Sequence, residues 1–151
     1  MLIRRVCLEI KEELSTIGPE YICDSDDAHK FVYKTIGKKT VECFEAIFMD
    51  NDYVPIEYTI VGIGTGSKVT IDISEIFKIG LLTNAKHILV AHNHLGCSVI
   101  PSESDINTTK KIGQIGKLLN IDLIDSVIVN ASDKYLSIRK TVLEKADNAV
   151  E

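Results

Sequence analysis

The stretch His92-Asn-His-Leu-Gly-Cys-Ser-Val-Ile-Pro-Ser-Glu-Ser-Asp105 decides the fold of this chain. It follows a short apolar run over residues 87–91 and precedes apolar residues at helical spacing. A continuous apolar run is typical of a strand covered on both faces. The stretch therefore predicts a central strand, a loop and a helix in succession. Two histidines end the strand, and a hydroxyl and a carboxylate lie in the first turn of the helix.

These polar residues have the spacing of a metal site. Side chains two apart on a strand point the same way, so His92 and His94 can aim at one point while Asn93 points away. A catalytic zinc needs three protein ligands and an open position for water. Asp105 can supply the third ligand from the first turn of the helix. Ser102 and Asp105 also fit a capping box, and the alternative is that they only start the helix.

The segments on both sides alternate between strand and helix patterns. Strands are predicted over residues 2–10, 41–49, 53–63, 87–91, 121–129 and 134–138. Helices are predicted to begin after Asp24, at Ile73 and after Ser102, and to end by Gly37, Asn84 and Leu119. The second and third helices have apolar stripes expected to face inward: Ile76, Ile79 and Leu82 or Thr83 in the second, and Ile106, Ile112, Ile115 and Leu119 in the third. The order indicates an α/β sandwich.

The strand over residues 41–49 carries two glutamates, Glu42 and Glu45. Alternation along a strand places Glu42 on one face with Phe44, Ala46 and Phe48, and Glu45 on the other with Cys43, Ile47 and Met49. The two carboxylates are therefore predicted to face opposite sides of the sheet.

Composition narrows the classes of function. A chain of 151 residues can form one domain with a sizeable core. It has no apolar run long enough for a membrane span and no visible signal peptide, so the expected location is the cytoplasm. The net charge of −5 disfavours direct nucleic-acid binding. Four scattered cysteines without a C-x-x-C pair suggest neither a disulfide framework nor a zinc ribbon.

His-x-His, seven residues, Ser, two residues, Asp resembles the signature of JAB/MPN (JAMM) metalloprotease domains, and the chain fits it without a gap. The stretches 92–94, 101–105, 75–78 and 84–85 resemble the RadC-like branch. The resemblance implies a single MPN/JAB domain, a cytidine-deaminase-like α/β/α sandwich with a mixed central sheet. We expect this domain over residues 25–140, after a strand and connector over 1–24 and before a tail over 141–151. We also expect a stand-alone form without the helix-hairpin-helix segment of full-length RadC proteins.

The same resemblance implies a zinc-dependent metallohydrolase that cleaves a peptide or isopeptide bond of a peptide or protein substrate with zinc-activated water. His92, His94 and Asp105 would bind Zn²⁺. Glu42, which fits the family's Glu-x-Phe pattern, would be the general base, with Glu45 as its rival. Ser102 would donate a hydrogen bond to the oxyanion. No membrane is implied, and homo-oligomer formation is left open.

Two further functions belong to the alternatives, namely a non-catalytic MPN interaction module and a DNA-repair-associated protein. A deaminase-type zinc site is disfavoured because its His-x-Glu and Pro-Cys-x-x-Cys elements are absent. The chain departs from the RadC-like pattern at residues 95–97, Ser74 and Ser126, which affects the substrate groove more than the metal ligands. Cys97 is interpreted as a packed thiol, with a redox-sensitive neighbour or an adventitious ligand as alternatives.

Overall fold

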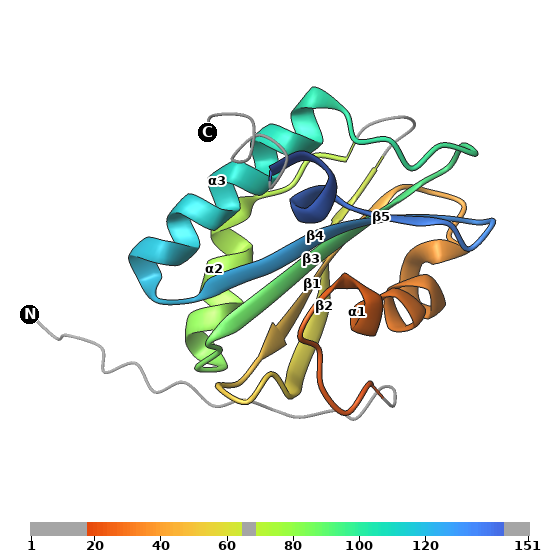
Figure 1. The fold of residues 1–151 in the computed structure, drawn as a ribbon. Coiled ribbons are helices and arrows are strands. Elements are labelled where there is room, and N and C mark those ends of the chain that lie inside the picture. Colours follow the sequence, from red (N-terminus) through yellow and green to blue (C-terminus); the bar gives the residue numbers. More distant parts are fainter. Residues whose placement is uncertain (1–17, 65–68, 144–151) are drawn as a thin grey trace, which may run out of the picture.

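The computed structural model describes residues 18–64 and 69–143 (Figure 1). The strand predicted over residues 2–10 lies outside this part of the chain, as does most of the predicted tail. The division into residues 1–24, 25–140 and 141–151 therefore stays a prediction. Within the described residues, no helix is long and apolar enough to cross a membrane.

A five-stranded sheet with the order β2-β1-β3-β4-β5 forms the middle layer. The strands are β1 (Cys43–Met49), β2 (Pro55–Ile63), β3 (His87–His94), β4 (Asp122–Asn130) and β5 (Tyr135–Ser137). Only β3 and β4 pair in parallel, and the remaining neighbours are antiparallel. The predicted mixed sheet is confirmed.

Helices cover both faces of this sheet (Figure 1). One face carries α1 (Ser25–Val32), which continues as a π-helical turn, η1 (Tyr33–Gly37). The other face carries α2 (Ile73–Leu82) and α3 (Glu103–Leu119). In the chain, a short π-helical turn, η2 (Arg139–Leu143), follows β5. The α/β/α sandwich expected from the sequence is therefore confirmed.

Short polar residues set where the elements begin, as the capping rules lead one to expect. The Asp24 carboxylate accepts from the backbone N–H groups of Asp26 and Asp27 at 2.8 and 3.2 Å, which starts α1. The Asp72 carboxylate accepts from Ser74 N at 2.9 Å and starts α2. In the β1–β2 turn, Asp50 accepts from the backbone of two residues that follow it, Asp52 and Val54.

The two sides of β1 face two separate cores. Phe44, Ala46 and Phe48 pack on the side of α2 and α3, whereas Cys43, Ile47 and Met49 pack on the side of α1. The alternation predicted for this strand is confirmed. β3 lies beside β1 and is covered on both faces, with Ile88 to Asn93 all buried. Its C-terminal end therefore reaches the surface only at His94.

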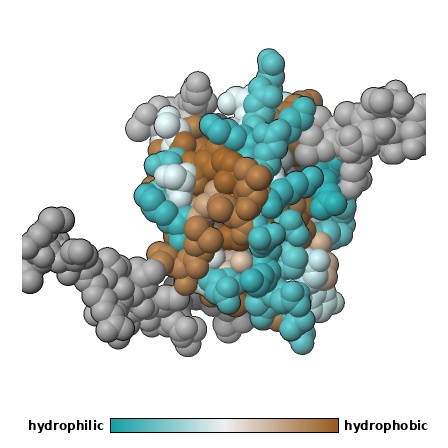
Figure 2. Space-filling model, turned by 90° about the vertical axis from the view of Figure 1, so that its left-hand side faces the viewer, coloured by the Kyte–Doolittle hydropathy of each residue, from teal (hydrophilic) through white to brown (hydrophobic). Residues whose placement is uncertain are grey.

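The helical stripes are partly different from the prediction. Ile76 and Ile112 are fully buried, whereas Leu119 is 36% exposed, so placing Leu119 inward is wrong. Of the two alternatives at the end of α2, Leu82 is 44% exposed and Thr83 is half-buried, so Thr83 is the one that faces inward. Leu82 and Leu119 are the last residues of α2 and α3, and Leu82 is out of phase with the buried positions Ile76, Phe77 and Gly80. Figure 2 shows hydrophobic surface on the side of the molecule where α2 and α3 end, and Leu81 and Leu118 are 57% and 83% exposed.

Candidate metal centre

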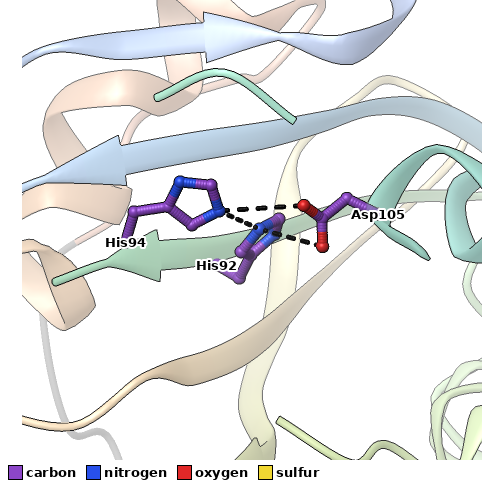
Figure 3. A group of neighbouring side chains, drawn as sticks. All are labelled: His92, His94 and Asp105. Atoms are coloured by element: carbon purple, nitrogen blue, oxygen red, sulfur yellow. Dashed lines mark hydrogen bonds and ion pairs between the residues drawn. The ribbon is translucent and has the colours of Figure 1, made fainter. Parts of the chain in front are cut away.

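Three side chains converge at the C-terminal end of β3 and the start of α3 (Figure 3). The Nε2 atoms of His92 and His94 lie 3.1 Å apart. His92 Nε2 is 3.4 Å from Asp105 Oδ1, and His94 Nε2 is 3.7 Å from Asp105 Oδ2. Among the described residues, this is the group of histidine, cysteine and acidic side chains whose atoms can hold one metal ion.

The strand fixes the direction of both imidazoles. His92 and His94 point to the same side of β3, and Asn93 between them points to the opposite side. There its side-chain oxygen accepts from Cys43 N at 2.6 Å, and its Nδ2 donates to Val41 O at 3.0 Å. These bonds join the end of β3 to the start of β1. They fix the backbone that carries the two histidines from the opposite face of the sheet.

Asp105 takes part in helix capping and in the histidine cluster at the same time. Its Oδ2 accepts from the backbone N–H and the hydroxyl of Ser102, both at 2.7 Å, and the Ser102 hydroxyl in turn accepts from Asp105 N at 3.2 Å. This is a complete capping box at the start of α3. Since Asp105 Oδ1 faces His92, the capping and ligand interpretations are not alternatives in this structure.

Hydrogen bonds shift the protonation of the cluster. His94 Nδ1 lies 3.1 Å from the carbonyl oxygen of Ser98, which suits an Nδ1–H donor and leaves Nε2 free for a metal. The bond with Asp105 raises the pKa of His94, and burial opposes this. Burial also raises the pKa of Asp105, but bonds from His92, His94 and Ser102 outweigh it and hold that pKa well below its usual range. Asp105 is therefore a carboxylate at neutral pH.

The cluster opens into a pocket of about 310 Å³. Glu42 and Ser102, both predicted as site residues, line this pocket together with the three candidate ligands. The ring of Phe44 forms part of the wall and stacks on His92 with centroids 5.9 Å apart and planes at 7°. The chain thus brings all five predicted site residues to one place, although what each does there stays a prediction.

Glu45 lies on the other face of β1, away from the pocket. It is fully buried, and neither carboxylate oxygen has a hydrogen-bond partner, since the nearby Thr35 hydroxyl donates to backbone carbonyls. Burial raises the pKa of Glu45 to about 7. Of the two glutamates, Glu42, directly before β1, is therefore the one that lines the pocket with the histidines.

Several residues of the site were not found by sequence reasoning. The carbonyl of Ser98 and the side chain of Asn93 support the histidines, and Asn130 Nδ2 donates to Cys97 O at 2.9 Å, which holds the loop after β3. The supporting role of Asn93 could have been suspected from the sequence, because an asparagine lies between the two histidines. The Cys97 side chain is exposed, so its interpretation as a packed thiol is wrong.

The donor set fits a zinc ion. Two imidazole nitrogens and one carboxylate oxygen are ligands that zinc prefers, and three protein ligands leave one position open. Two ligand atoms of a tetrahedral zinc, each about 2.0–2.1 Å from the metal, lie roughly 3.3 Å apart. The two histidine Nε2 atoms are 3.1 Å apart, close to this value, and one ligand atom from each of the three residues lies within 4.8 Å of the other two. The residues present can therefore bind such a metal.

Comparison with known proteins agrees with this arrangement. The profile of a family described as the RadC-like JAB domain matches residues 22–143. A UPF0758 protein of Staphylococcus carnosus is 33% identical over 116 residues, which are 77% of this chain and 51% of that protein. UPF0758 proteins of Finegoldia magna and Methanosarcina acetivorans are 33% and 29% identical over 78% and 87% of this chain. The chain spans between 51% and 58% of the length of these curated relatives.

Proposed function

We propose that this chain, which belongs to the RadC-like JAB domain family, is a zinc-dependent hydrolase that cleaves a peptide or isopeptide bond. The single observation that carries the proposal is the convergence of His92, His94 and Asp105 within a pocket that Glu42 also lines. Metal binding alone requires only the first three residues. Hydrolysis requires in addition a carboxylate in the same pocket, which Glu42, the residue before β1, would supply.

A zinc ion held by the three ligands would supply Lewis acidity, which polarises an amide carbonyl and lowers the pKa of water to about 7. Glu42 would accept the proton of the attacking water and return it to the leaving amine. Glu42 supports this role because it lines the same pocket as His92, His94 and Asp105. Glu45 has no access to the same water because it is sealed on the opposite face.

Ser102 has a second role in this proposal. Its hydroxyl lines the pocket and donates to the Asp105 carboxylate at 2.7 Å. The backbone N–H of Ser102 bonds to the same oxygen, so the carboxylate keeps its orientation if the hydroxyl turns away. The hydroxyl would then donate to the oxygen of the cleaved carbonyl, where negative charge develops.

The test combines metal removal with unbiased detection of cleavage. The purified chain is stripped with a chelator, reloaded with one equivalent of zinc and incubated with a pool of synthetic peptides and isopeptide-linked peptides. New termini that appear only after reloading, as seen by mass spectrometry, support the proposal. A protein that holds one zinc per chain and cleaves nothing in this pool would instead favour a non-catalytic MPN interaction module.

A further inference from the structure

The pocket beside the metal ligands has two walls of different chemistry. One wall is polar and comes from the first turns of α3, with Ser102, Ser104 and Thr108. The other is apolar and comes from Phe44 on β1 and from Val69 and Ile71, which precede α2. A catalytic metal site needs no such apolar wall, so this wall requires a separate explanation.

The apolar wall is built on a close backbone approach at Gly62. A Cβ atom at this position would lie 2.7 Å from Ile71 Cγ2, 2.8 Å from Val69 Cγ1 and 3.2 Å from the carbonyl oxygen of Thr70. Gly62 pairs with Phe44 in the sheet. The lack of a side chain on β2 therefore lets the segment 69–71 cross the strand and reach the pocket next to Phe44.

The side chains of the apolar wall also pack against the hydrophobic core. Phe44 is 7% exposed and belongs to the core beneath α2 and α3, and Val69 and Ile71 pack against the same core while part of each side chain faces the pocket. Preformed apolar surface of this kind gains free energy when an aliphatic group covers it. The same pocket is lined by the carboxylate of Glu42, which would repel an acidic side chain.

We propose that Phe44, Val69 and Ile71 form a subsite for the aliphatic side chain of the substrate residue next to the cleaved bond, and that Gly62 sets its width. The inference rests on the proposed function and adds the class of substrate, namely peptides with a branched aliphatic residue such as valine or leucine at that position. A pocket of about 310 Å³ is at the lower end of the range of ligand sites. Within it, the apolar wall of Phe44, Val69 and Ile71 would contact one substrate side chain.

The experiment measures preference in two ways. Zinc-loaded parent protein digests peptides that differ only at the residues flanking the cleaved bond, with alanine, valine, leucine, phenylalanine or aspartate in turn. In parallel, zinc-loaded Glu42→Gln protein is titrated calorimetrically with the same peptides, which reports binding without turnover. We expect leucine or valine to be favoured over alanine by about tenfold or more, and aspartate to be the poorest.

The variants Val69→Ala and Ile71→Ala should each reduce the aliphatic preference by about tenfold at unchanged zinc content. Gly62→Ala should change the preference as well, because its new Cβ displaces Val69 and Ile71. The matched control is Val54→Ala, which removes an exposed aliphatic side chain on the same hairpin, outside the pocket, and should leave the preference unchanged. Circular dichroism verifies that each variant is folded.

The possible failures are distinguishable. Cleavage that ignores the flanking side chain, or a preference that survives both Val69→Ala and Ile71→Ala, overturns the subsite and leaves the hydrolase in place. A zinc-loaded parent that cleaves no peptide, together with a Glu42→Gln protein that binds none, overturns the proposed function and the subsite with it. Selective binding by Glu42→Gln that is lost in Val69→Ala/Glu42→Gln supports the subsite independently of turnover.

Discussion

Glu42, directly before β1, and Glu45, within it, are the same residue type three positions apart, and their surroundings differ completely. Glu42 lines an open pocket with two histidines and a second carboxylate. Glu45 is enclosed in the core on the α1 side, where neither oxygen finds a hydrogen-bond donor. Strand parity alone separates the two carboxylates. The difference teaches that, in a sheet covered on both faces, the face a residue occupies decides whether its charge can be used.

The strongest expected effect concerns the ligands on the pocket side. His92→Ala should weaken zinc binding by more than about a hundredfold, because two protein ligands cannot replace three. Metal content after dialysis and competition with a zinc-binding dye measure this effect. The control is His87→Ala, which removes a histidine from the other end of the same strand and should bind zinc like the parent. Equal zinc binding by both variants would disprove the ligand assignment.

Replacing each glutamate by glutamine in a separate variant tests the comparison most directly. Glu42→Gln should keep its zinc and lose about 10²- to 10⁴-fold in kcat, as expected for loss of a general base. Glu45→Gln should stay within a few-fold of the parent, because its side chain cannot reach the pocket. Steady-state hydrolysis of a peptide substrate decides between them. The comparison breaks if Glu45→Gln is the inactive variant.

Glu45 should instead appear in the pH dependence of stability. Its pKa is raised from 4.5 to about 7 in the folded protein, so between these values the native state binds more protons than the unfolded state. Stability should therefore fall as pH rises from about 4.5 to about 7 and then level off, and the shift corresponds to about 3 kcal/mol. Urea unfolding of the parent and Glu45→Gln at pH 5 and pH 8 measures this difference.

In Glu45→Gln this contribution to the pH dependence should disappear. The variant should therefore be more stable than the parent at pH 8, where the parent carries the buried charge, and differ less from it at pH 5. Glu57→Gln on the exposed face of β2 is the matched control and should follow the parent. A Glu45→Gln protein that loses stability at pH 8 would mean that the buried carboxylate has a partner on the α1 side that compensates for its charge.

The smallest expected effect separates the capping role of Ser102 from its chemical role. Ser102→Ala should cost about 1 kcal/mol of stability, whereas Ser102→Gly should cost only a few tenths, because glycine is a better N-cap than alanine. Both variants remove the hydroxyl. If the hydroxyl donates to the substrate, both should lose the same factor in hydrolysis despite their different stability. Losses of activity that follow stability would assign Ser102 to capping alone.

Much of this molecule could be predicted from periodicity. Alternation in residues 41–49 assigned the two glutamates to opposite faces, and the spacing of two between His92 and His94 assigned both to one side of β3. The order of strands and helices followed from apolar runs and turn residues. These features depend on local geometry, which the sequence determines directly.

The remainder depends on contacts that no local pattern contains. Helical spacing finds the apolar stripes of α2 and α3 but not how far each stripe stays covered at the helix end, where Leu119 is 36% exposed. The position of Val69 and Ile71 depends on the missing side chain of Gly62, and these residues meet only in the folded state. The sequence also could not show that Asp105 takes part in both the capping box and the histidine cluster. The two interpretations compete until the distances are known.

The antiparallel pairing of β1 with β3, in which Phe44 lies opposite His92, has a consequence for the order of folding events. The three candidate ligands lie within 14 residues of one another along the chain, so only a short loop must close to bring them together. Glu42 lies 50 residues before His92 and arrives only when the long-range pairing forms. We therefore expect a partly folded chain to capture metal before it can hydrolyse anything, so that activity is withheld until the sheet is complete.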